Sequence, residues 1–75
     1  MMAPLPVLSG RAVAETFVRL GWEIARQRGS HIILVRAGPP ATLSVPDHPE
    51  VKRGTLRALI RRASVTVDDF LAARE

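Results

Sequence analysis

The sequence contains no cysteine, so disulfide bonds, thiolate catalysis and zinc sites built on thiolates are all excluded. Aromatic residues make up only 4% of the chain, which argues against binding of single-stranded nucleic acid by successive base stacking. No apolar run approaches the length that crosses a bilayer, and no basic residue precedes the short apolar run at the N-terminus. We therefore expect a cytoplasmic protein with no membrane contact and no disulfide partner.

Sequence motifs for metal or nucleotide chemistry are also missing. The five glycines are scattered, so no phosphate-cradling loop is present. His31 and His48 could in principle join Asp47 and Glu50 around a metal ion, but their spacing repeats no known metal motif. We expect neither a metal nor another cofactor.

The length and composition favour one small globular domain. A chain of 75 residues is near the lower size limit at which a hydrophobic core alone stabilises a fold, without disulfide bonds or metal ions. A hydrophobic fraction of 47% and a charged fraction of 24% are typical of a folded chain. We expect residues 1–7, which contain Pro4 and Pro6, to be a flexible N-terminal segment, and residues 8–75 to form the single domain.

Positive charge is concentrated in the middle of the chain. The net charge is +4 overall, whereas residues 24–62 contain eight basic side chains and two acidic ones, a local net charge of +6. Such a centre suits a polyanion, because Arg and Lys contacts to phosphate supply most of the sequence-independent affinity for nucleic acid. A solvated basic surface without a particular ligand is the alternative that charge alone leaves open.

The first half of the chain predicts a helix followed by a β-hairpin. Ser9 can cap a helix over residues 11–20 that Gly21 ends. The next strand alternates, which puts Ile24 and Arg26 on the same face. The Gly-Ser dipeptide directly before His31 suits a two-residue primed turn. His31 is then the first residue of a second strand. The expected strands are residues 22–28, 31–36 and 41–45.

The second half predicts two helices after the third strand. We expect a helix over residues 55–62, and Thr66 and Asp69 resemble a capping box that opens a short last helix. A stripe of arginines at i, i+4 spacing runs along the outer face of the first of these helices: Arg53, Arg57 and Arg61. Like charges at this spacing repel by a few tenths of a kcal/mol, so an external anion explains the stripe better than helix stability does. The element order predicts an α+β fold, a three-stranded antiparallel sheet with helices packed on one face.

His31 is the best candidate for chemistry. Metal-free RNA cleavage needs a base for the 2′-hydroxyl, positive groups near the phosphate and an acid for the leaving 5′-oxygen, and imidazole can act as base or acid near neutral pH. His31 follows a turn beside Arg28, and Gly29 would let a backbone approach closely. An ordinary strand histidine, satisfied by a neighbouring group, is the alternative. His48 lies in a proline-flanked loop, where a solvent-exposed histidine is ordinary.

Five short fragments in a fixed order carry a family resemblance. They are Leu8-Ser9-Gly10-Arg11, Leu20-Gly21-Trp22, Arg26 to His31, Val45-Pro46-Asp47-His48, and Gly54 to Ala63. Together they resemble the HicA toxins of bacterial and archaeal HicA/HicB toxin–antitoxin pairs. The resemblance covers about residues 8–71, and the order and spacing of the fragments make it specific.

The resemblance implies a fold like that of a double-stranded-RNA-binding domain, an mRNA endoribonuclease (interferase) activity and neutralisation by a HicB antitoxin that covers the active site. It also implies that His31 is catalytic, and His48 matches a position where the family often has histidine, so we treat it as a possible auxiliary residue. Together with the charge pattern, it leads us to expect RNA contacts from six residues: Arg28, Gly29, Ser30, Lys52, Arg53 and Arg57.

Two positions depart from the family pattern. Many members carry a second histidine directly after the first, where this chain has Ile32. His31 must therefore work alone or with a group from elsewhere in the fold. Many members also have Ala-Gly between the last two helices, where this chain has Ala63-Ser64. That difference concerns the geometry of the last turn.

Two other functions stay open at this point. A non-catalytic RNA-binding or partner-binding module would carry the same positive charge and would never cut RNA. A protein that acts only inside a complex would use Ile33 and Val35 as a docking surface, provided that these residues face away from the helices. His31 directly after its turn is the feature that favours the enzyme.

Overall fold

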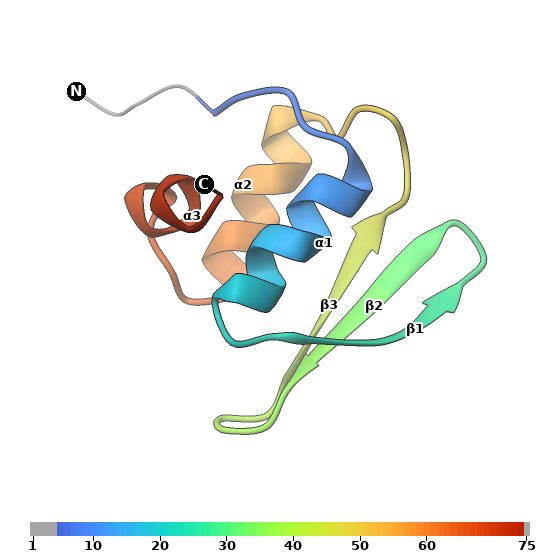
Figure 1. The fold of residues 1–75 in the computed structure, drawn as a ribbon, viewed down its shortest axis with the longest axis vertical. Coiled ribbons are helices and arrows are strands. Elements are labelled where there is room, and N and C mark those ends of the chain that lie inside the picture. The colour runs from blue at the N-terminus through green and yellow to red at the C-terminus, as the bar shows by residue number, and fades with distance from the viewer. Residues whose placement is uncertain (1–4, 75) are drawn as a thin grey trace.

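The structure, a computed structural model, describes residues 5–74 and has the order helix, three strands, two helices (Figure 1). The elements are α1 (Gly10–Arg19), β1 (Glu23–Arg28), β2 (His31–Arg36), β3 (Ala41–Pro46), α2 (Arg53–Arg62) and α3 (Val67–Ala73). The strands form one antiparallel sheet in the order β1-β2-β3, and Figure 1 shows the helices together on one side of it. This is the predicted α+β architecture, with an order like that of a double-stranded-RNA-binding domain.

The start of α2 differs from the prediction by two residues. The helix begins at Arg53, and Lys52 is an N-cap with an extended backbone that makes no side-chain capping hydrogen bond. The prediction placed Arg53 and Gly54 in a loop because sequence signals for a helix start rely on Ser, Thr, Asp or Asn at the cap. By contrast, the capping box between Thr66 and Asp69 at the start of α3 is confirmed, with both of its hydrogen bonds present.

A β-bulge in β1 changes which way this strand's side chains face. The register shifts so that Ile24 pairs with Leu34, whereas Arg26 pairs with Ile33. Because consecutive residues of β2 face opposite sides of the sheet, Ile24 and Arg26 do so as well. The prediction of a shared face for these two residues was wrong, because it assumed unbroken alternation along the strand.

The hydrophobic core lies between the sheet and the three helices. Phe17 of α1 is fully buried and contacts two other aromatic rings, Trp22 edge-on at a centroid distance of 6.4 Å and Phe70 of α3 at 5.2 Å. Trp22 is 3% exposed, and the guanidinium of Arg36 lies 4.6 Å above its ring. The tryptophan, which directly precedes β1, is therefore a core residue.

The ordered packing begins upstream of the predicted domain start. Residues 1–4 of the expected flexible segment lie outside the described residues. Leu5 is buried in the core, and its carbonyl accepts a hydrogen bond of 2.8 Å from Nε of Arg53. Leu8 pairs with Val51 in an isolated antiparallel bridge. Residues from Leu5 onward thus contribute to the packed domain.

The sheet face turned away from the helices offers less apolar surface than the sequence suggested. Ile33 pairs with Ser44 and lies outside the main core cluster, yet it is only 9% exposed. Val35 on the same face is half-buried. A docking surface built from Ile33 and Val35 would therefore present little of Ile33 to a partner.

Helices α1 and α2 end in the same hydrogen-bonded motif. The two residues after each cap donate their N–H groups to carbonyls of the last turn, a Schellman arrangement. The pairs are Gly21 to Val18, Trp22 to Phe17, Ser64 to Arg61 and Val65 to Ile60. The motif needs a left-handed residue directly after the cap, and this residue is Gly21 (φ 101°) in one helix and Ser64 (φ 60°) in the other.

We expect Ser64→Gly to raise the free energy of unfolding by about 1 kcal/mol, because a left-handed backbone penalises every side chain with a Cβ. Urea denaturation measures the change, and the m-value should stay constant. The converse variant, Gly21→Ser, is the matched control and should lower the stability. A neutral or destabilising Ser64→Gly would contradict this assignment.

Candidate functional site

His31 lies at one end of the sheet, where the β1–β2 turn meets the loop after β3. The strand register places Arg28 of β1 directly opposite His31 on one side and Pro46 of β3 on the other. Side chains of directly paired residues on one sheet face lie about 4.5–5.5 Å apart at Cβ. Arg28 and His31 are both exposed, so a cation and an imidazole share one accessible surface.

The turn before His31 has the predicted form. Gly29 has a φ of 58° and Ser30 has no positive φ, which is the pattern of a type II′ hairpin turn. The Ser30 carbonyl accepts a hydrogen bond of 2.7 Å from the N–H of Asp47. This hydrogen bond holds the turn against the loop between β3 and α2.

The N-terminus of α1 packs against the same loop. The N–H of Gly10 donates to the carbonyl of His48 at 2.9 Å. A Cβ at position 10 would collide with the carbonyl oxygen of Pro46 and lie 2.9 Å from Cα of Asp47. Only glycine allows this approach. Three segments, 10–11, 27–31 and 46–48, thus form one unit, which we call the His31 corner.

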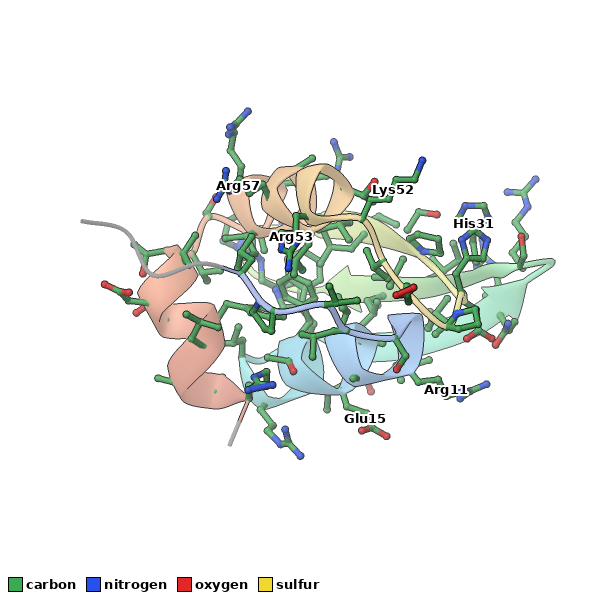
Figure 2. All side chains as sticks on the ribbon, turned by 90° about the horizontal axis from the view of Figure 1, so that it is seen from above. Arg11, Glu15, His31, Lys52, Arg53 and Arg57 are labelled. Atoms are coloured by element: carbon green, nitrogen blue, oxygen red, sulfur yellow. The ribbon has the colours of Figure 1, made fainter. Side chains whose placement is uncertain are left out.

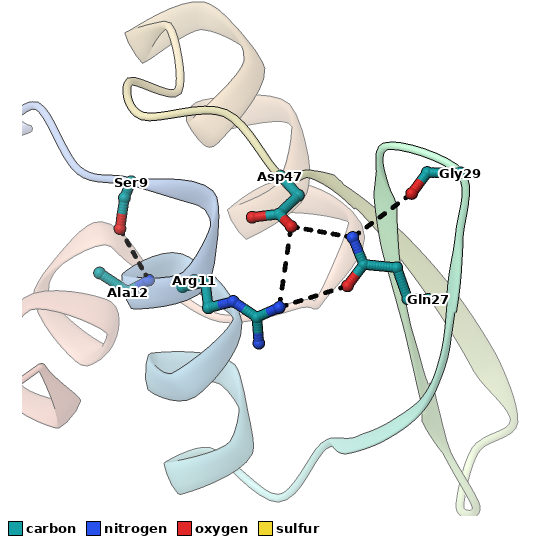
Figure 3. Close-up of polar contacts among 6 residues, drawn as sticks. All are labelled: Ser9, Arg11, Ala12, Gln27, Gly29 and Asp47. Carbon is teal, nitrogen blue, oxygen red and sulfur yellow. Dashed lines mark hydrogen bonds and ion pairs between the residues drawn. The ribbon is translucent and has the colours of Figure 1, made fainter.

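Side-chain contacts among Arg11, Gln27 and Asp47 also join these segments (Figure 3). Nε2 of Gln27 donates to Oδ2 of Asp47 at 2.8 Å and to the carbonyl of Gly29 at 3.3 Å. Nη2 of Arg11 lies 3.4 Å from Oε1 of Gln27 and 3.8 Å from Oδ2 of Asp47. No spacing or composition signal in the sequence predicts this cluster, although its residues lie within the family-like fragments around Gly10, Gln27 and Asp47.

The eight basic residues between positions 24 and 62 divide into two groups. Several guanidinium groups donate to backbone carbonyls and so serve the fold: Arg36 to Pro39 and Ala63, Arg53 to Leu5, and Arg62 to Thr42. Within residues 5–74, other cations of the basic middle make neither a hydrogen bond nor an ion pair through their side chains. These are Arg26, Arg28, Lys52, Arg57 and Arg61.

The predicted phosphate-binding residues are not equally placed with respect to His31. Figure 2 shows Lys52 at the end of α2 nearer His31 and Arg57 toward the other end of that helix. Arg53 lies between them, and its Nε is already bonded to the Leu5 carbonyl. The structure therefore brings Arg28 and Lys52 to the side of the molecule where His31 lies, and it separates Arg57 from that corner.

His48 lies in the loop two residues after β3, at the same end of the sheet as His31, and it is exposed. Its carbonyl holds Gly10, so the backbone of this residue has a structural role. Across residues 5–74, no group of three or more His, Asp or Glu side chains is arranged to hold a metal ion. None of the helices in this part of the chain is long and apolar enough to span a bilayer.

The fold and the His31 corner together define a small α+β domain, like a double-stranded-RNA-binding domain in its order, with an exposed histidine opposite an exposed arginine. Residues 10–65 match the family model described as HicA toxin of bacterial toxin-antitoxin. Because this match covers most of the chain, the protein belongs to the HicA toxin family and has the role of a toxin that pairs with an antitoxin. No curated protein matches the chain.

Proposed function

We propose that the protein is a metal-independent endoribonuclease that cleaves mRNA at the His31 corner. The observation that carries the proposal is that His31 is exposed and lies opposite Arg28. Backbone and side-chain hydrogen bonds hold this corner in place, and the chain belongs to a toxin family. A fixed backbone around an accessible imidazole is what proton transfer requires, because a general base acts only within hydrogen-bond reach of its proton.

In the proposed reaction, the His31 imidazole takes the proton of a ribose 2′-hydroxyl. The 2′-oxygen then forms a bond to the adjacent phosphorus, and the bond from phosphorus to the 5′-oxygen breaks. The departing oxygen takes up a proton from an acid, which leaves a 2′,3′-cyclic phosphate on one fragment and a 5′-hydroxyl on the other. His48, at the same end of the sheet, is the auxiliary group that we place nearest this step.

Arg28 and Lys52 are the cations that we propose to contact the scissile and neighbouring phosphates. Both are exposed, and neither is committed to another group within residues 5–74. The exposed turn of Gly29 and Ser30 would let the RNA backbone approach, since one of its residues has no side chain. Arg53 adds positive charge near the proposed phosphate contacts, while its Nε donates a hydrogen bond to the Leu5 carbonyl.

Incubation of the purified chain with an end-labelled mRNA in EDTA tests the proposal. We expect defined fragments to appear at the same rate with and without EDTA. Binding of the RNA without any cleavage would contradict the enzyme and support the non-catalytic RNA-binding module. Cleavage that stops in EDTA would contradict the metal-independent mechanism.

We expect Lys52→Gln to weaken RNA binding without removing it. Loss of one phosphate contact should reduce the slope of log K against log salt by about 0.7 for a single strand. Fluorescence anisotropy at several salt concentrations measures the slope, in a His31→Ala background that prevents cleavage. Arg74→Gln removes the same charge at the end of α3 and is the matched control. Equal slopes for the Lys52 variant and its parent would contradict the phosphate contact.

We further propose that the partner is a HicB-type antitoxin that covers the His31 corner. Support comes from the family, whose members pair with an antitoxin, and from the exposure of the corner. Adding a cognate HicB-type antitoxin should stop cleavage and shield His31 from diethylpyrocarbonate. Inhibition with His31 still fully reactive would place the antitoxin elsewhere on the toxin.

A further inference from the structure

A hollow between α2 and α3 lies on a part of the surface that the cleavage proposal does not use. It has a volume of about 270 Å³, and its lining combines three aliphatic side chains with two arginines: Ile60, Val65, Val67, Arg57 and Arg61. The Schellman turn at Ser64 shapes this hollow, because it brings Val65 back toward the last turn of α2. We call it the α2–α3 pocket.

The two arginines of the pocket are exposed, one turn apart on α2. Their like charges oppose helix formation by a few tenths of a kcal/mol. In the described part of the chain, neither makes a hydrogen bond or an ion pair, whereas Arg53 and Arg62 of the same helix bind backbone carbonyls. Among residues 5–74, the fold therefore uses the other arginines of α2 and gives the Arg57 and Arg61 side chains no hydrogen-bond or ion-pair partner.

We infer that the α2–α3 pocket is a docking site for an acidic segment of a partner protein. An aliphatic side chain of that segment would pack on the floor made by Ile60, Val65 and Val67, and flanking carboxylates would pair with Arg57 and Arg61. Arginine forms bidentate hydrogen bonds with carboxylates, and an apolar floor rewards burial of a methyl-rich side chain.

The floor of the pocket favours a protein over an RNA. Its three residues offer no side-chain hydrogen-bond donor or acceptor for a base edge and no aromatic ring on which a base could stack. A phosphodiester backbone would gain from the arginines but nothing from the aliphatic floor. A Leu, Ile or Val side chain flanked by carboxylates would contact both the aliphatic floor and the two arginines.

The pocket is separate from the His31 corner. Figure 2 shows Arg57 toward the end of α2 remote from Lys52 and His31. In the sequence, the pocket residue Val67 is followed by two acidic residues in the first turn of α3. Asp68 is exposed, and the carboxylate of Asp69 accepts a hydrogen bond from the N–H of Thr66. Docking at this pocket does not depend on the cleavage proposal, and it could fail or succeed independently of it.

NMR titration of the ¹⁵N-labelled full chain with the peptide acetyl-Glu-Asp-Leu-Asp-Glu-amide tests the inference. We expect the largest amide shifts at Ile60, Arg61, Val65 and Val67. Arg61→Glu should weaken the apparent affinity by about tenfold, because it replaces attraction by repulsion at the rim of the pocket. Arg74→Glu makes the same charge change at the C-cap of α3, outside the pocket lining, and should leave the affinity unchanged.

Two further probes separate the apolar contribution from the charge. A peptide with Ser in place of Leu should lose most of the shifts at Val65 and Val67, and Val67→Ser should remove most of the shift at Val65 for the original peptide. Shifts spread over all exposed cations, or equal effects of Arg61→Glu and Arg74→Glu, would overturn the inference. It would also be overturned if single-stranded RNA or a second copy of the chain, and not the peptide, shifted the pocket residues.

Discussion

Replacing His31 with alanine should abolish both RNA cleavage and growth arrest. General acid–base catalysis by one side chain is worth about 10²–10⁴-fold in rate, and no second imidazole stands next to His31 because residue 32 is isoleucine. Single-turnover cleavage of a labelled mRNA by the purified variant measures the loss, and expression in a host lacking the antitoxin measures growth arrest. Undiminished cleavage by a cleanly purified His31→Ala protein would contradict a catalytic role.

The fold should survive this substitution. His31 is exposed, so the free energy of unfolding should change by no more than about 0.5 kcal/mol. Thermal unfolding and antitoxin binding report whether the variant is folded. His48→Ala is the comparison variant, and we expect it to lose less activity than His31→Ala because we propose only an auxiliary role for its side chain. A larger loss for His48→Ala would reverse the two roles.

Gly10→Ala should destabilise the domain by about 2–3 kcal/mol, because overpacking against backbone cannot be relieved by rotating a side chain. The new methyl group would collide with the Pro46 carbonyl and crowd Asp47, so α1 would have to move away from the β3–α2 loop. Since this loop and the turn before His31 share a backbone hydrogen bond, cleavage should fall as well. Urea denaturation and the cleavage assay measure the two effects.

Gly54→Ala is the matched control for this variant. A Cβ at position 54 meets nothing within 4 Å, and the residue lies in α2. Alanine there should raise stability by up to about 1 kcal/mol through its helix propensity. If both substitutions changed stability equally, the close approach at Gly10 would not be what holds the corner together.

Local sequence signals were sufficient for most of the fold. The hairpin turn at Gly29–Ser30 and the capping box at Thr66 depend on residues that are adjacent or three apart, so the sequence displays them directly. The Ser9 cap and the Gly21 stop located α1 in the same way, within one residue of its observed bounds. The bulge in β1 was missed because it depends on pairing with β2, and no turn or glycine signal marks it.

The candidate site was only partly predictable for the same reason. His31 and Arg28 flank a turn, and their pairing follows from the hairpin alone. The contacts of Gly10 and the cluster of Arg11, Gln27 and Asp47 join segments far apart in the chain, which no spacing rule reveals. Charge counts likewise did not show which arginines bind backbone carbonyls and which make no side-chain hydrogen bond within residues 5–74.

The chemical nature of the RNA ends after cleavage tests the central claim most directly. Mass spectrometry of fragments made by the wild-type chain in EDTA identifies these ends. Attack by the 2′-oxygen, assisted by His31, predicts a 2′,3′-cyclic phosphate and a 5′-hydroxyl, and a substrate with 2′-deoxyribose at the cleaved position should stay intact. Fragments that carry a 3′-hydroxyl and a 5′-phosphate, or cleavage of the deoxy-substituted site, would contradict the account.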